Sequence, residues 1–274
     1  MRIEVLIENS THSDLLSEHG LSFLIHFNNK VYLLDAGKTG AFMDNTKSMH
    51  IDLSKVDKCV LSHAHYDHSD GFIRFLDAYP NQKIYASENV FGEYYSTSNN
   101  ELHYIGLDER LKGKKENFHL ISKVTCIDEG VYLVPHRSSQ HTINKNLYKK
   151  VSNECIFDDF THELSLVFEK DDELVVLNSC SHVGMLSVIE ELSYLFKDKK
   201  VKAYFGGLHM KGRHHGEEIC VYNNEQIEEI CEVITKNNIE VYTGHCTGDI
   251  AFAKLKEQCD DLIHKLYSGL SIEI

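Results

Sequence analysis

Four potential metal ligands lie within the short run His63–His68, which reads HAHYDH. The run follows an apolar segment, Lys58–Leu61, that we predict to be a β-strand, and it precedes a helical pattern over Gly71–Ala78. Two histidines that are two residues apart on extended backbone project to the same side and can bind one ion. The chain changes direction at Asp67 and His68, so their side chains can reach a second ion. The run therefore predicts a metal site where a strand ends.

Two histidines far downstream occupy comparable positions. His182 follows the predicted strand Leu174–Leu177, and His245 follows the predicted strand Glu240–Tyr242. A catalytic zinc ion typically has three protein ligands and one water, so two ions need about six side chains, of which the run supplies only four. We therefore predict that His182 and His245 are the fifth and sixth ligands.

The elements that must position these side chains alternate between two kinds of pattern. Apolar runs that end in turn residues predict ten strands, Ile3–Ile7, Leu21–Phe27, Val31–Leu34, Lys58–Leu61, Lys83–Tyr85, Val131–Val134, Leu164–Phe168, Leu174–Leu177, Lys202–Phe205 and Glu240–Tyr242. Helical periodicity predicts four helices, Gly71–Ala78, Gly184–Phe196, Glu225–Lys236 and Ala251–Cys259. This alternation predicts a layered α/β fold.

Domain boundaries are often marked by a linker rich in Ser, Gly or Pro, and this sequence has no such segment. The only prolines are Pro80 and Pro135, and no Ser/Gly-rich linker divides the sequence, so we predict one domain over residues 1–274. The stretch 93–150 is more polar and less periodic than the rest. It is either a lid over the site or an ordinary surface excursion.

Charge and composition narrow the class of partner. Lys and Arg number 28 against 42 Asp and Glu, and the resulting net charge of -14 disfavours nucleic acid and anionic membrane surfaces. No apolar run is long enough to span a membrane, and the start lacks the features of a signal peptide. The 8 cysteines contain no CxxC pair, which favours reduced thiols. We expect a cytoplasmic protein with a small-molecule substrate; the pattern does not indicate an oligomeric state.

The run His63–His68 resembles the HxHxDH signature of the metallo-β-lactamase fold superfamily, and Leu33–Gly37 resembles the Asp-x-Gly turn that precedes it. Five further segments are similar to the branch typified by 7,8-dihydropterin-6-methyl-4-(β-D-ribofuranosyl)aminobenzene-5'-phosphate synthase, namely Ile7–Asn9, Glu18–Ser22, Cys180–His182, Gly206–His209 and His245–Gly248. The resemblance spans nearly the whole chain. It implies a four-layer αβ/βα sandwich with a dinuclear site at one edge.

The ligands divide into two sets with a bridging water or hydroxide. We assign one ion to His63, His65 and His182, and the other to Asp67, His68 and His245. The superfamily usually adds a bridging Asp, yet the strand Lys202–Phe205 leads into a segment without a carboxylate. A second assignment therefore stays open, in which Cys180 or His182 bridges and His162 is the third histidine. His209 is either an additional ligand or a substrate contact.

Two divalent ions lower the pKa of a bound water and polarise the oxygen of the substrate, which predicts metal-dependent hydrolysis. In this hypothesis Asp67 also orients the hydroxide, and either His209 or a group on the 93–150 segment stabilises the developing charge. Zn²⁺ is the expected metal, with Fe and Mn as alternatives. The basic segment Lys211–His215 suits an anionic, phosphate-bearing or pterin-like substrate.

Other functions remain open at this point. They are a non-haem-iron oxidoreductase or a dihydropterin-type synthase or transferase with the same fold, and a metal-stabilised binding protein without turnover. Three further polar residues have less specific roles. Asp35 is expected to support the loop or a ligand histidine, while Glu8 and Asn9 either line the pocket or form a turn.

Overall fold

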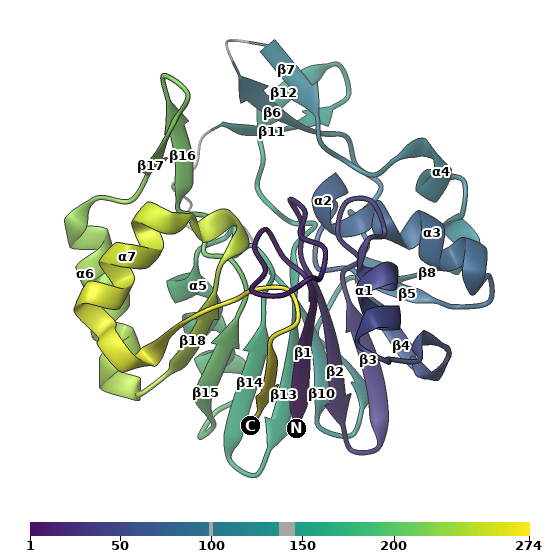
Figure 1. Ribbon diagram of the computed structural model, residues 1–274. Coiled ribbons are helices and arrows are strands. Elements are labelled where there is room, and N and C mark those ends of the chain that lie inside the picture. Colours follow the sequence, from purple (N-terminus) through teal and green to yellow (C-terminus); the bar gives the residue numbers. More distant parts are fainter. Residues whose placement is uncertain (99–100, 137–145) are drawn as a thin grey trace.

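Two seven-stranded β-sheets face each other at the centre of the computed structural model, which describes residues 1–98, 101–136 and 146–274 (Figure 1). The first sheet has the order β20-β1-β2-β3-β4-β5-β8. Its strands are β1 (Arg2–Ile7), β2 (Ser22–Phe27), β3 (Lys30–Leu34), β4 (Lys58–Val60), β5 (Ile84–Ser87), β8 (Phe118–Ile121) and β20 (Ser271–Glu273). From β20 to β3 neighbours are antiparallel, and from β3 to β8 they are parallel.

The second sheet has the order β19-β18-β15-β14-β13-β10-β9. Its strands are β9 (Thr125–Asp128), β10 (Val131–Pro135), β13 (Leu164–Lys170), β14 (Glu173–Leu177), β15 (Lys200–Phe205), β18 (Glu240–Thr243) and β19 (Ile263–Lys265). Again one half is antiparallel, and the half from β14 to β19 is parallel. Because the carboxyl ends of parallel strands share one edge, the loops after β4, β14 and β18 can meet there.

Helices cover the outer face of each sheet, as Figure 1 shows. The first sheet carries α1 (Phe42–Ser48), α2 (Tyr66–Ser69), α3 (Gly71–Ala78) and α4 (Glu109–Lys112) on its side, and the second carries α5 (Met185–Leu195), α6 (Asn224–Asn237) and α7 (Asp249–Cys259). Short 3₁₀ turns are η1 (Leu53–Lys55), η2 (Lys115–Asn117), η3 (His245–Thr247) and η4 (Asp260–Leu262). The predicted four-layer α/β sandwich is confirmed.

Three apolar clusters hold the four layers together. The cluster between the sheets is rich in aromatic side chains, and Phe23 of β2 meets Phe205 of β15 edge to face with ring centroids 6.4 Å apart. The outer clusters place Phe72 and Phe75 of α3 on the first sheet, and Ile227 of α6 among the side chains that cover the second sheet. Burial of these large side chains is the main favourable term in folding.

Two smaller β structures stand at the edge where the parallel strands end (Figure 1). A four-stranded sheet has the order β12-β11-β6-β7, with β6 (Tyr94–Ser98), β7 (Glu101–Tyr104), β11 (Leu147–Val151) and β12 (Glu154–Phe157). A hairpin is formed by β16 (Lys211–His214) and β17 (Glu217–Cys220). The stretch 93–150 therefore contributes to this sheet and also supplies β8, β9 and β10 to the main sheets. Its role as a lid stays a prediction, and 99–100 and 137–145 lie outside the described residues.

All ten predicted strands and all four predicted helices are present, with end points that differ by a few residues at most. One prediction about the cysteines is wrong, because Cys231 of α6 and Cys259 of α7 form a disulfide. The two helices pack side by side, which brings together thiols that are 28 residues apart in the sequence. Across the described ranges, none of the helices has the length and apolar character needed to cross a membrane.

Candidate metal centre

The first set of predicted ligands converges at the edge between the two main sheets. His63 and His65 follow β4, and His182 follows β14. Their ligand atoms all lie within 4.8 Å of one another, and the three side chains are buried. No hydrogen-bond partner among the described residues reaches Nε2 of these histidines. We call His63, His65 and His182 the His63 trio.

The protonation state of this trio suits a cation. Burial, together with the neighbouring histidines, lowers the pKa of His63 and His182 well below the ordinary value, and burial and His162 lower that of His65 to about 3. The three rings are therefore neutral near neutral pH. Ser62 Oγ lies 2.8 Å from His63 Nδ1, which leaves Nε2 of His63 to face the other two rings. Buried, unpartnered nitrogens that converge in this way fit a metal ion.

The loop that carries His182 is held by a buried acid. Glu163 accepts hydrogen bonds from the backbone N–H groups of His182 and Val183, at 2.9 and 3.1 Å. The His182 ring also stacks on Phe160, with ring centroids 4.8 Å apart. These contacts fix the direction of the imidazole before any ion binds.

The second set of predicted ligands is just as close. Nε2 of His68 and Nε2 of His245 are 3.1 Å apart, and Asp67 Oδ2 lies 3.8 Å from the first nitrogen and 3.4 Å from the second. Asp67 and His68 come from α2, whereas His245 opens η3 after β18. We call Asp67, His68 and His245 the Asp67 trio.

The orientation of these two imidazoles follows from what their other nitrogens touch. His68 Nδ1 lies 2.8 Å from the Asp35 carboxylate, and His245 Nδ1 lies 2.9 Å from Asn9 Oδ1. Since both oxygens accept, each Nδ1 carries the proton and each Nε2 presents a lone pair. Two lone pairs 3.1 Å apart repel unless a cation, either a proton or a metal ion, lies between them. With Asp67 alongside, this set of two imidazoles and one carboxylate fits a divalent metal ion.

Buried acids also support this trio, as expected for Asp35. Its carboxylate accepts from Ser62 N and Ser62 Oγ, both at 2.7 Å, in addition to His68. Glu8 accepts from the backbone N–H of His245 at 2.6 Å, and Asn9 holds the ring of the same histidine. The sequence left pocket lining or a turn open for Glu8 and Asn9; the structure instead shows that both position His245, a proposed ligand.

Four residues near the centre have a left-handed backbone conformation. Asp35, Ser181, His209 and His245 all have positive φ, between 49° and 59°. Residues with a side chain at Cβ adopt this conformation rarely, and each such residue costs about 1–3 kcal/mol. All four lie where strands of the two sheets end, and strain of this kind concentrates at functional sites.

His19 is close to the Asp67 trio and was not predicted as a site residue. Its Nε2 lies 3.2 Å from Asp67 Oδ2, and its ring stacks on that of His245 with centroids 5.0 Å apart. The side chain is 52% exposed. A Cβ on the next residue, Gly20, would lie 2.6 Å from the carbonyl oxygen of Asp67, so glycine there permits the close approach. This His-Gly pair is the signal in the sequence that could have identified the position.

His162, which the second assignment uses as a ligand, has both ring nitrogens engaged. Its Nδ1 accepts from the backbone N–H of Ala64 at 3.1 Å, so the proton is on Nε2, which lies 3.0 Å from Asp158 Oδ2. A ring in this state has no lone pair for a metal. The geometry therefore favours His182 over His162 as the third histidine. His209 lies beside His182, with ring centroids 4.2 Å apart.

A cavity of about 1060 Å³ opens over both trios. Its floor includes His65, Asp67, Cys180, His182 and His245. One wall comes from the four-stranded sheet, through Ser96, Thr97 and Leu147, and another from the β16–β17 hairpin, through Lys211, Arg213 and His215. Lys211 is paired with Glu218 at 2.7 Å, whereas no ion pair involves Arg213 in the described part of the chain.

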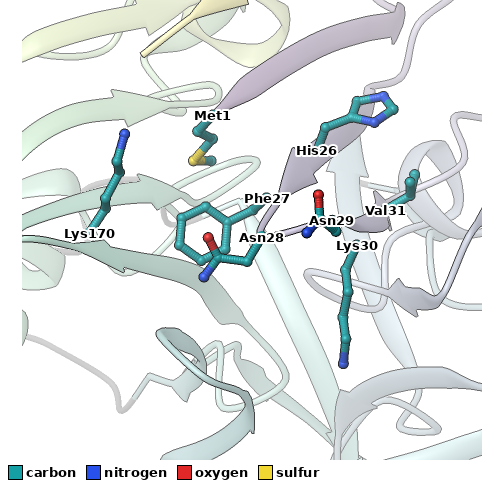
Figure 2. Close-up of a pocket in the computed structure, with 8 residues that line it drawn as sticks. All are labelled: Met1, His26, Phe27, Asn28, Asn29, Lys30, Val31 and Lys170. Carbon is teal, nitrogen blue, oxygen red and sulfur yellow. The ribbon is translucent and has the colours of Figure 1, made fainter.

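A second hollow, of about 420 Å³, lies at the turn between β2 and β3. Figure 2 shows the residues that line it, among them Met1, Phe27, Asn28 and Lys170. This turn is at the end of the sheets remote from both trios, because β1 starts there and ends beside Glu8. The residues that line this hollow include neither a carboxylate nor a cluster of metal ligands. The candidate functional site is therefore the larger cavity.

Comparison with known proteins agrees with this arrangement. Residues 18–151 match the family model described as the metallo-beta-lactamase superfamily. A solved structure described as a metal-dependent hydrolase of the β-lactamase superfamily has a TM-score of 0.83 and 26% identity, with 100% of this chain and 99% of that chain covered. The chain has the fold of the metallo-β-lactamase superfamily.

Two further proteins extend the comparison. The 7,8-dihydropterin-6-methyl-4-(β-D-ribofuranosyl)-aminobenzene-5'-phosphate synthase of Methanocaldococcus jannaschii is 25% identical over 278 residues, with 95% of this chain and 92% of that protein covered. A diphosphatase of the PhnP family shares the fold, with a TM-score of 0.53 and 13% identity over 100% of this chain and 97% of that chain. The predicted resemblance to the metallo-β-lactamase fold and to the synthase branch is confirmed.

Proposed function

We propose that the chain is a dinuclear metal-dependent hydrolase that acts on a small, phosphate-bearing or pterin-like substrate. The observation that carries this proposal is that the two trios lie side by side at one cavity. Hydrogen-bond partners at Nδ1 orient His63, His68 and His245, and Glu163 holds the backbone of His182. The His63 trio would hold one ion and the Asp67 trio the other, with Zn²⁺ as the expected metal. Bound there, two divalent ions would supply a hydroxide near neutral pH and polarise the substrate oxygen.

The protein's own residues would orient the attack. Burial raises the pKa of the Asp67 carboxyl, but His68 and His245 lower it more, so the carboxyl is ionised. An ionised oxygen 3.4 Å from His245 Nε2 can both ligate an ion and accept a hydrogen bond from the attacking water. His209, which lines the cavity beside His182, would stabilise developing charge or protonate the leaving group.

The walls of the cavity support an anionic substrate. The hairpin presents Arg213 and His215 to the cavity, although the whole chain carries a net charge of -14. An Arg side chain that has no carboxylate partner can bind a phosphate group through two parallel hydrogen bonds. The compound in the name of the synthase relative carries a 5'-phosphate, which is consistent with this class of ligand.

A synthase or transferase acting on a dihydropterin is the second candidate. It is favoured by the 25% identity to the synthase over 95% of this chain. In that case the same two ions would activate a substrate group in place of water. Products would distinguish the two reactions, since a hydrolase consumes water and a synthase joins two organic substrates.

Metal content is the first test. Elemental analysis of purified protein is expected to give about two metal ions per chain, and His65→Ala should lower this ratio and abolish turnover of phosphodiesters, lactones or thioesters together. His119→Ala, at an exposed position on β8, is the matched control and should change neither. A ratio near zero in carefully purified wild-type protein, or full activity of the His65→Ala variant with its metal retained, would overturn the proposal.

The substrate panel separates the remaining functions. A metal-stabilised binding protein would retain two ions and hydrolyse none of the three substrate classes. A non-haem-iron oxidoreductase would contain iron and consume dioxygen. Either result would replace the hydrolase proposal while leaving the metal site in place.

A further inference from the structure

The proposed ligand set is short of negative charge. It contains five imidazoles, which are neutral when they bind a metal, and one carboxylate, Asp67. Two buried divalent ions carry four positive charges, and uncompensated charge is costly in a low-dielectric interior. A further anionic ligand is therefore expected near both trios.

Cys180 is the described side chain that best meets this requirement. Its sulfur lies 3.2 Å from His68 Nε2, and the residue is only 3% exposed. Cys180 Sγ lies within 4.8 Å of the ligand atoms of His63 and His68, and in a second cluster within 4.8 Å of those of His245 and Cys246. It thus reaches members of the His63 trio and of the Asp67 trio at once.

The loop after β14 holds Cys180 in this position. Asn178 Oδ1 accepts from the backbone N–H of Ser181 at 2.7 Å, and Ser181, with φ of 51°, donates its hydroxyl to the carbonyl oxygen of Gly207 at 2.8 Å. The Nε2 atoms of His63 and His65, which no described hydrogen-bond partner reaches, are an independent sign of a ligand at this point. The sulfur therefore lies in a preformed site.

We propose that the Cys180 thiolate bridges the two metal ions, in the role that a carboxylate after Lys202–Phe205 does not fill. This inference rests on the proposed dinuclear function. On metal binding the S–H bond breaks, the proton passes to solvent, and the sulfur donates electron pairs to both ions, so no oxidant or reductant is needed. The thiolate lowers the net charge of the centre by one.

Cys246 is a neighbouring thiol that makes a different set of contacts. Its sulfur lies 3.7 Å from the carbonyl oxygen of Cys180, and it shares a metal-ligand cluster with His245 but not with the His63 trio. A Cβ on Gly207 would lie 2.3 Å from this sulfur, so Cys246 is packed against that glycine. Cys246→Ser is therefore a closely matched control for Cys180→Ser.

Cobalt(II) provides a test that does not depend on turnover, because a cobalt-bound thiolate gives an intense near-ultraviolet charge-transfer band that imidazole and carboxylate ligands do not give. We expect the band in wild-type protein with two Co²⁺ per chain, and in Cys246→Ser. It should disappear in Cys180→Ser. Cys180→Asp, which replaces the thiolate by a carboxylate, should keep two Co²⁺ without the band and so shows that loss of the band is not loss of folding.

The outcomes distinguish this inference from the proposed function. Two bound Co²⁺ in the wild type without the band, or a band that survives in Cys180→Ser, would overturn the bridging thiolate alone. A band lost only in Cys246→Ser would show that Cys246, and not Cys180, is the thiolate ligand. Failure of the wild type to bind Co²⁺ at all would overturn the dinuclear function as well.

Discussion

Asp35 offers the sharpest test of how the protein prepares the Asp67 trio. The residue touches neither cavity nor proposed ion, yet its fully buried carboxylate accepts from Ser62 N, Ser62 Oγ and His68 Nδ1. In Asp35→Asn the amide oxygen can still accept from the backbone N–H of Ser62 at the Oδ1 position, and the NH₂ group then takes the Oδ2 position, which Ser62 Oγ and His68 Nδ1 share. There the NH₂ group would face the N–H of His68, so that imidazole must turn or move its proton to Nε2, where it blocks metal binding.

The size of the effect follows from that single lost contact. A hydrogen bond to a charged group contributes about 1.5–3 kcal/mol, and removing the partner of a ligand histidine costs about 10–100-fold in metal affinity. We therefore expect the ion of the Asp67 trio to bind about 10–100-fold more weakly. The ion of the His63 trio should change by less than about threefold, because the link from Ser62 to His63 is preserved.

Competition with a chromophoric chelator measures the two binding steps separately. His245→Ala identifies which step belongs to the Asp67 trio, since it removes one ligand of that trio only. The control is Asp52→Asn, which changes a remote, exposed carboxylate that accepts from Ser54 N and Ser54 Oγ at 3.0 and 2.6 Å. Equal weakening of both steps in Asp35→Asn, or no weakening, would refute the reasoning.

Three further predictions concern stability. Cys231→Ser opens the bond to Cys259, which spans 28 residues, and chain entropy predicts a loss of about 3.6 kcal/mol in the free energy of unfolding; an unchanged urea midpoint would contradict this. Gly71→Ala would place a Cβ 1.8 Å from the carbonyl oxygen of Ala36 and should cost about 1–3 kcal/mol in thermal unfolding, whereas Gly113→Ala, with its nearest neighbours at 3.5 Å, should not. In metal-free protein, burial lowers the pKa of each member of the His63 trio below 6.5. Below pH 6.5 the unfolded chain binds protons that the folded chain does not, so the free energy of unfolding should decrease by up to about 1.4 kcal/mol per pH unit for each histidine. Urea unfolding at several pH values measures this, and a free energy of unfolding that does not change with pH would contradict the prediction.

Strong hydrophobic periodicity made the main sheets and their helices predictable. The helix predicted over Gly71–Ala78 has the same bounds as α3, because one face of it is apolar and buried. Two of the strands that were not predicted, β7 and β16, lack such a face. Every residue of β7 is exposed, and β16 reads KGRH, so their pairing depends on neighbours in space that local sequence does not reveal.

The candidate site was predictable where side chains follow the ends of parallel strands, since such ends share one edge of a sheet. The structure brings together all six side chains assigned to the two ions. His19 was not predicted because it lies in the loop before an antiparallel strand, and the rule about the ends of parallel strands does not apply there. The choice against His162 needed the positions of Asp158 and Ala64 N, and the disulfide needed the packing of α6 on α7, neither of which is encoded in spacing alone.

Each trio draws its members from both halves of the chain. His63, His65, Asp67 and His68 belong to loops of the first sheet, whereas His182 and His245 belong to loops of the second. An ion held by either trio would therefore act as a crosslink between the two sheets at the edge farthest from the paired chain termini. Loss of the metal ions would then affect stability as well as activity. Without these two crosslinks, the two halves of the protein would separate more easily during proteolysis or under mechanical load.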